Sequence, residues 1–224
     1  MRDKYDKKLD KLHDELIKMG TACEEAIGFA VTGLLDEDSV LREKAIAAER
    51  EIDRRQRGIE GFCMRLIMRE QPVASDLRQI IAAIKIVTDM ERIGDHAEDI
   101  AEVSKKLDGT NVQSDVNIAD MTTAALKMLT GALDAFVTAD LDKVNAVKEY
   151  DEVVNKYFEK IRGEIEEHIK RNVNDAAACL DLLMIAKYLE RIGDHAKNIA
   201  EWVEFSITGE LNGKKVMLTR RSKK

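Results

Sequence analysis

The stretch ERIGDHAEDIAE, residues 91–102, decides how the rest of the chain is interpreted, because a nearly identical stretch follows later. The second copy, ERIGDHAKNIAE, occupies residues 190–201 and matches the first at ten of its twelve positions. Both copies have the apolar spacing of an amphipathic helix, interrupted by a glycine and by several acidic residues. A segment repeated at a spacing of 99 residues predicts two structural units of similar architecture.

The composition predicts an all-α protein. One proline, 12 glycines, 4% aromatic and 35% charged residues are typical of helices, whereas strands favour β-branched and aromatic runs. Since the repeated segment falls late in the third and in the last predicted helix, we expect two pseudo-symmetric three-helix bundles, residues 1–110 and 111–208, followed by a basic, flexible tail, residues 209–224. Periodicity and breakers place the six helices at residues 4–33, 38–70, 74–107, 115–138, 141–171 and 174–208.

Charge and hydropathy exclude several classes of protein. The net charge of −7 argues against nucleic-acid binding, which requires a basic surface. No apolar run approaches the roughly 18 residues of a membrane span, and the polar N-terminal sequence is unlike a secretory signal. Cys23, Cys63 and Cys179 are odd in number and lack CxxC spacing, so we expect buried thiols in a reducing compartment. The predicted location is cytoplasmic.

One side of the repeated segment is acidic. At about 100° per residue, the apolar side chains and Gly94 form one stripe, and the acids lie on an adjacent side of the helix. Like charges four residues apart cost roughly 0.2–0.5 kcal/mol per pair, and glycine costs about 1 kcal/mol relative to alanine. Because both costs are repeated, we expect the acids to be retained for a function, and we interpret Gly94 as a point of close helix approach. The acids are Glu91, Asp95, Glu98, Asp99 and Glu102.

The second copy retains oxygen-bearing side chains at every one of these positions except that of Glu98, where Lys197 stands. The preceding helix of each unit adds two oxygen donors four residues apart, in EREID at residues 49–53 and in DEVVN at residues 151–155. Carboxylate and amide oxygens suit hard cations, so the facing rows predict a metal site in each unit. A row spanning two turns is about 12 Å long, which favours more than one ion. We expect the first site to bind more tightly, because Asn155, Asn198 and Lys197 weaken the second.

Two other interpretations compete with a metal-binding regulator. The acids of a purely structural adaptor would form an ordinary solvated helix face. A di-iron carboxylate enzyme would need ExxH motifs, but none of the four histidines has a glutamate three residues before it, and a P-loop is also lacking. We therefore expect a protein that is not an enzyme. His96 and His195 lie beside the apolar stripe and are expected to be partly buried and hydrogen-bonded, while Arg92 is expected to pair with neighbouring acids.

The chain resembles the PhoU family of phosphate-signalling regulators. The resemblance rests on ERIGDHA in the third and sixth helices, on EREID in the second, and on LHDELIKMGTACEEAI, residues 12–27, in the first. It implies two pseudo-symmetric bundles, a homodimer, and multinuclear clusters of iron, manganese, magnesium or zinc. Asn155 stands where the family pattern has an acid. The metal ligands implied by the E(D)xxxD signature are Glu49, Asp53, Glu91, Asp95 and Asp99 in the first unit, and Asp151, Glu190, Asp194 and Asn198 in the second.

The resemblance also implies a role. PhoU proteins lower the output of the phosphate-starvation response, linking the ATPase subunit of the phosphate ABC transporter to a sensor histidine kinase. The chain would then approach the membrane only through these partners. The alternative is a metal-binding accessory protein of another phosphate transporter, without a transcriptional role.

Overall fold

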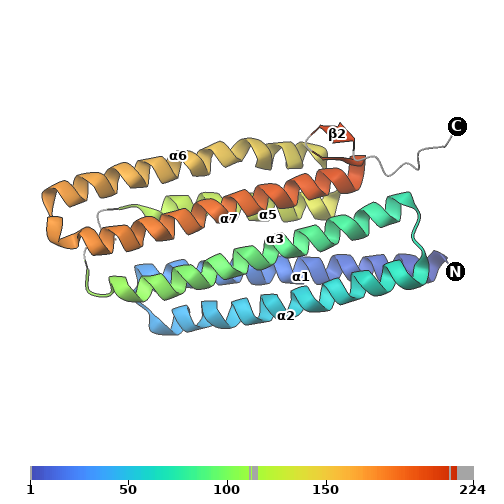
Figure 1. Cartoon of the computed structure of the whole chain (residues 1–224), viewed down its shortest axis with the longest axis horizontal. Coiled ribbons are helices and arrows are strands. Elements are labelled where there is room, and N and C mark those ends of the chain that lie inside the picture. The colour runs from blue at the N-terminus through green and yellow to red at the C-terminus, as the bar shows by residue number, and fades with distance from the viewer. Residues whose placement is uncertain (1, 111, 113–115, 212, 216–224) are drawn as a thin grey trace, which may run out of the picture.

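The computed structural model describes residues 2–110, 112, 116–211 and 213–215. Within these residues, six long helices run along one axis as two bundles of three, which confirms the predicted fold class (Figure 1). The first bundle consists of α1 (Arg2–Leu35), α2 (Ser39–Glu70) and α3 (Ala74–Ser104). The second consists of α5 (Ile118–Thr138), α6 (Leu141–Arg171) and α7 (Ala176–Thr208), and short 3₁₀ turns lie at η1 (Lys105–Leu107) and η2 (Val173–Asp175).

The ends of α2 show how local chemistry sets the helix boundaries. The Asp38 carboxylate accepts hydrogen bonds from the backbone amides of Val40 and Leu41, at 2.7 and 3.2 Å, and so satisfies two amides without an intrahelical partner. At the other end, Gln71 adopts a left-handed backbone with φ of 46°, directly before Pro72. The predicted boundaries of this helix are therefore confirmed to within one residue.

The region after α7 is the predicted basic tail, and the structure describes only its first residues. Gly209 ends the helix with φ of 76°, and Gly213 allows a turn with φ of 70°. β1 (Glu210–Leu211) follows Gly209 and pairs antiparallel with β2 (Lys214–Lys215), which follows Gly213, so the tail begins with a short hairpin. The remaining predicted tail, residues 216–224, lies outside the described residues.

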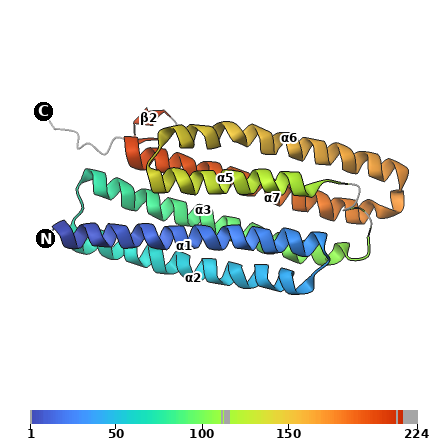
Figure 2. The same ribbon diagram turned by 180° about the vertical axis from the view of Figure 1, so that it is seen from behind.

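The two bundles meet along α3 and α7. These helices lie side by side at the centre of the molecule and run in opposite directions (Figure 1). On the other face, α1 lies beside α5 (Figure 2). Apolar side chains from both repeated segments, including Ile93, Ile100 and Ile192, belong to one continuous core. All three cysteines are buried free thiols, as predicted.

The repeated glycines are points of close helix contact, as predicted. A Cβ atom added to Gly94 would lie 3.1 Å from both Cδ1 and Cγ2 of Ile52, on α2. A Cβ atom added to Gly193 would lie 3.3 Å from Cγ1 of Val154, at the equivalent place on α6. The glycines therefore bring the second and third helices of each bundle together beside the acidic side chains.

We expect Gly94→Ala to lower the free energy of unfolding by about 1–2 kcal/mol, because Ile52 is fully buried and cannot move aside freely. This loss outweighs the gain of about 1 kcal/mol in helix propensity. Gly193→Ala, which meets a single Val154 methyl group at a longer distance, is the matched control and should be close to neutral. Urea unfolding of both variants checks this, and a more stable Gly94→Ala protein would contradict it.

Candidate functional site

A cluster of acids lies between α2 and α3, at the predicted position of the first site. Glu49 on α2 is half-buried, and loss of water around it raises its pKa. The carboxylates of Glu98 and Asp95 on α3, and of Asp53 on α2, raise the Glu49 pKa further. The two predicted rows therefore face each other closely enough to repel.

Two further acids belong to this cluster, and the sequence analysis placed neither of them among the ligands. Burial and then the charges of Glu102 and Asp95 raise the pKa of Glu98, which faces Glu49. Glu60 on α2 is one of the charges that raise the pKa of Glu91. Glu60 could have been found from its spacing, since it lies seven residues after Asp53. We call Glu49, Asp53, Glu60, Glu91, Asp95 and Glu98 the first cluster.

Arginines compensate only part of the first cluster. Arg57 pairs with Asp53 at 2.7 Å, and Arg92 pairs with Asp95 at 2.9 Å, as predicted for Arg92. In the described part of the chain, Glu49 forms no ion pair, and neither does Glu98. The charge of Arg50 lowers the pKa of both Glu49 and Glu98, but burial and the neighbouring carboxylates outweigh it, so the middle of the cluster keeps an excess of negative charge.

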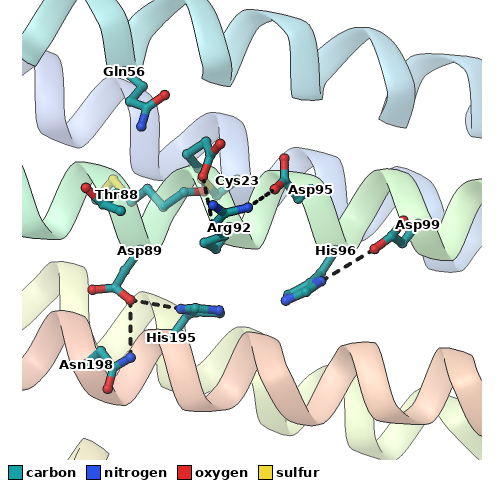
Figure 3. Close-up of polar contacts among 12 residues, drawn as sticks. Cys23, Gln56, Thr88, Asp89, Arg92, Asp95, His96, Asp99, His195 and Asn198 are labelled. Carbon is teal, nitrogen blue, oxygen red and sulfur yellow. Dashed lines mark hydrogen bonds and ion pairs between the residues drawn. The ribbon is translucent and has the colours of Figure 1, made fainter.

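Two predicted ligands, Asp99 and Asn198, turn toward the interface between the bundles. Asp99 lies at the edge of the first cluster, with Oδ2 3.6 Å from Nδ1 of His96, on the side that faces α7 (Figure 3). Asn198 on α7 points toward α3, where its side-chain amide donates a 3.2 Å hydrogen bond to Asp89 (Figure 3). The structure therefore does not bring Asn198 together with the acids of α6.

The second unit has a different arrangement, in which lysines contact the acids. Asp151 on α6 is buried, and its Oδ2 lies 2.8 Å from Nζ of Lys197 on α7. Lys187 pairs with Glu190. Loss of water contact and then the charges of Asp151 and Glu190 raise the pKa of Asp194, whose side chain remains exposed. We call Asp151, Lys187, Glu190, Asp194 and Lys197 the second cluster.

The histidines of the repeated segment lie where the two bundles meet. His195 shares a 2.8 Å hydrogen bond with Asp89, which confirms its predicted role (Figure 3). His96 is buried as predicted, with its ring 5.6 Å from the rings of both His195 and Tyr188, but its Nδ1 makes no hydrogen bond in the described part of the chain. Burial and then the charge of His195 lower the pKa of His96, so it is neutral at pH 7.

The donor chemistry of the first cluster fits a hard cation, because its ligands are carboxylates whose negative charges repel each other. The side chains do not converge on one point, however. Across the described residues, no group of three or more His, Cys, Asp or Glu side chains lies close enough together to hold a metal ion. A bound cation would draw these carboxylates inward through changes of side-chain rotamer.

Comparison with known families accounts for both repeats. The family model of the PhoU domain matches residues 16–104 and again residues 118–203. The chain belongs to the PhoU family. Each match covers most of one three-helix bundle, including one copy of the repeated segment.

Relatives support the assignment to the PhoU family over almost the whole chain. A phosphate-specific transport system accessory protein PhoU homolog from Clostridium acetobutylicum is 36% identical, covering 92% of this chain and 95% of the relative. The crystal structure of PhoU from Pseudomonas aeruginosa superposes with a TM-score of 0.87 at 33% identity, covering 92% of this chain and all of the other. A phosphate transport system regulatory protein PhoU from Streptococcus pneumoniae superposes with a TM-score of 0.84 at 28% identity, covering 92% of this chain and 98% of the other.

Among the described helices, none combines the length and the apolar character needed to cross a lipid bilayer.

The raised pKa values of the first cluster predict how pH affects the metal-free protein. A carboxyl group whose pKa is higher in the folded than in the unfolded chain binds more protons when folded, so its contribution to stability falls as pH rises above about 4.3. Replacing Glu49 and Glu98 by glutamine removes this effect. We expect the double variant to be more stable than the wild type by about 0.5–1 kcal/mol at pH 7, with a smaller advantage at pH 5.

Urea unfolding at both pH values, in the presence of a chelator, measures this difference. Glu152→Gln, an exposed acid on α6, is the control and should not change the pH dependence. An advantage of the double variant that is equal at pH 5 and pH 7 would show that folding does not raise the pKa values of Glu49 and Glu98.

Proposed function

We propose that this chain is a non-enzymatic, metal-binding regulator of phosphate uptake that lowers the phosphate-starvation response. The observation that carries the proposal is the PhoU-domain match in both repeats, because the relatives named above are accessory or regulatory proteins of phosphate transport systems. The proposed partners are the ATPase subunit of the phosphate ABC transporter and a sensor histidine kinase. The chain would act as a cytoplasmic homodimer and reach the membrane only through these partners.

The absence of recognisable catalytic motifs in the sequence is consistent with regulation through binding. A protein of this kind changes a partner by binding one of the partner's conformations more tightly than another. The long helices offer extended surfaces for such contacts, and their polar faces remain exposed along the whole length of both bundles.

We place metal binding at the first cluster. The middle of this cluster holds more carboxylates than its neighbouring arginine can compensate, and a divalent cation would reduce their repulsion. Because the ligands are oxygen atoms, manganese, magnesium and iron suit the cluster better than copper does, and zinc is also accommodated by carboxylates. Multinuclear binding is consistent with the number of acids along the row.

The regulatory proposal predicts the behaviour of a deletion strain. In cells with ample phosphate, loss of the gene should raise the output of an alkaline phosphatase reporter, because the negative signal is removed. A plasmid-borne wild-type gene should restore repression. A silent reporter in a strain with no second PhoU-family gene would contradict the proposal. Altered phosphate uptake with a silent reporter would instead favour an accessory protein without a transcriptional role.

The metal proposal predicts that Asp95→Asn weakens binding of Mn²⁺ by about tenfold or more, as the loss of a ligand should. The metal-free variant should be at least as stable as the wild type, because one of several like charges is removed. Asp134→Asn, an exposed aspartate on α5, is the matched control. Equilibrium dialysis measures the affinity, and an Asp95→Asn variant that unfolds without metal would show that Asp95 has a structural role instead.

A further inference from the structure

The two clusters differ at one pair of equivalent positions. Equivalent residues lie 102 positions apart in the second helices and 99 apart in the third, so Glu49 corresponds to Asp151, and Glu98 corresponds to Lys197. In the first unit, these positions hold two carboxylates, and neither forms an ion pair within the described residues. In the second unit, they hold an ion pair with an N–O distance of 2.8 Å.

We propose that Lys197 is the built-in cation of the second unit: its ammonium group supplies, from within the chain, the positive charge that the first cluster takes from a metal ion. The chain would therefore bind metal through the first cluster only. This inference rests on the proposed metal binding at the first cluster, and it assigns the two repeats different roles.

A second lysine acts in the same direction. Lys187 pairs with Glu190 and lies with its Nζ 5.1 Å from the centre of the Phe158 ring. The equivalent positions in the first unit are occupied by Thr88 and Gln56, which carry no charge (Figure 3). Both bases of the second cluster are thus specific to the second unit.

The burial of the pair makes it difficult to replace. The side chain of Asp151 is only 12% exposed, and that of Lys197 is 35% exposed. An ion pair in such a position is screened less by water than a surface pair, and removing one partner leaves a buried charge without compensation. A divalent cation entering the second cluster would have to break the Lys197–Asp151 ion pair, whereas Glu49 and Glu98 form no ion pair within the described residues that a cation would have to break.

The exchange of the two residues tests this inference. Glu98→Lys gives the first unit the arrangement of the second, and Lys197→Glu gives the second unit the arrangement of the first. We expect Glu98→Lys to abolish most Mn²⁺ binding and Lys197→Glu to raise the number of Mn²⁺ ions bound per chain, as measured by equilibrium dialysis and metal analysis. Lys156→Glu, an exposed lysine on α6, is the control and should leave the number unchanged.

A measurement without metal separates this inference from the metal proposal. In the presence of a chelator, Glu98→Lys should raise the melting temperature by about 1–4 °C, because it replaces a repulsion by an attraction, and Lys197→Glu should lower it by at least as much. If the melting temperatures shift in this way but neither the wild type nor Lys197→Glu binds Mn²⁺, the metal proposal fails and the assignment of Lys197 as the compensating charge remains.

Two results would overturn the inference. In the first, Asp194→Asn in the otherwise wild-type chain lowers the number of bound Mn²⁺ ions, which would mean that Lys197 swings away and the second cluster binds metal. In the second, the melting temperature of the metal-free protein is unchanged by both exchanges, which would mean that Lys197 contributes no compensating charge.

Discussion

The close contact of α2 with α3 at Gly94 is the constraint on which the candidate site depends. Ile52 packs against the glycine with no room for a side chain between them, so the backbones of the two helices lie near each other at this point. The acids that flank this contact are held within range of one another, and burial strengthens their repulsion. The same packing, with Val154 against Gly193, recurs in the second unit. A duplicated core contact thus creates two equivalent positions for charged groups, one in each bundle.

What fills those positions differs between the bundles, although the fold around them is the same. In the first unit, Glu98 raises the pKa of Glu49 and no lysine stands between them, and we propose that a cation from solution relieves this repulsion. In the second unit, the equivalent positions hold opposite charges, because Lys197 pairs with Asp151. On this proposal, Lys197 and Lys187 in place of Glu98 and Thr88 make the second unit compensated from within the chain, while the helix contact at the glycine is the same in both units.

The sequence was sufficient to predict the bundles, because the repeat, the helix breakers and the periodicity all agree with the observed packing. It was also sufficient to predict that the two acidic rows face each other. It could not give the direction of side chains at the edge of a row. Asp99 and Asn198 turn toward the interface between the bundles, and a helical wheel of a single helix carries no information about that interface. The spacing of Glu60 from Asp53 was a usable signal that was overlooked, whereas the place of Glu98 opposite Glu49 depends on the partner helix. The hairpin after Gly209 is too short to leave a periodic signal.

The central claim, that the acids between α2 and α3 bind a metal while the second unit carries its own cation, is most directly tested by crystallography. Crystals of the wild-type protein grown with Mn²⁺ should be measured near the manganese absorption edge. The account predicts anomalous difference density between α2 and α3, beside Glu49 and Glu98, and none between α6 and α7. Density of equal height beside Asp151 and Asp194, or density only there, would contradict it.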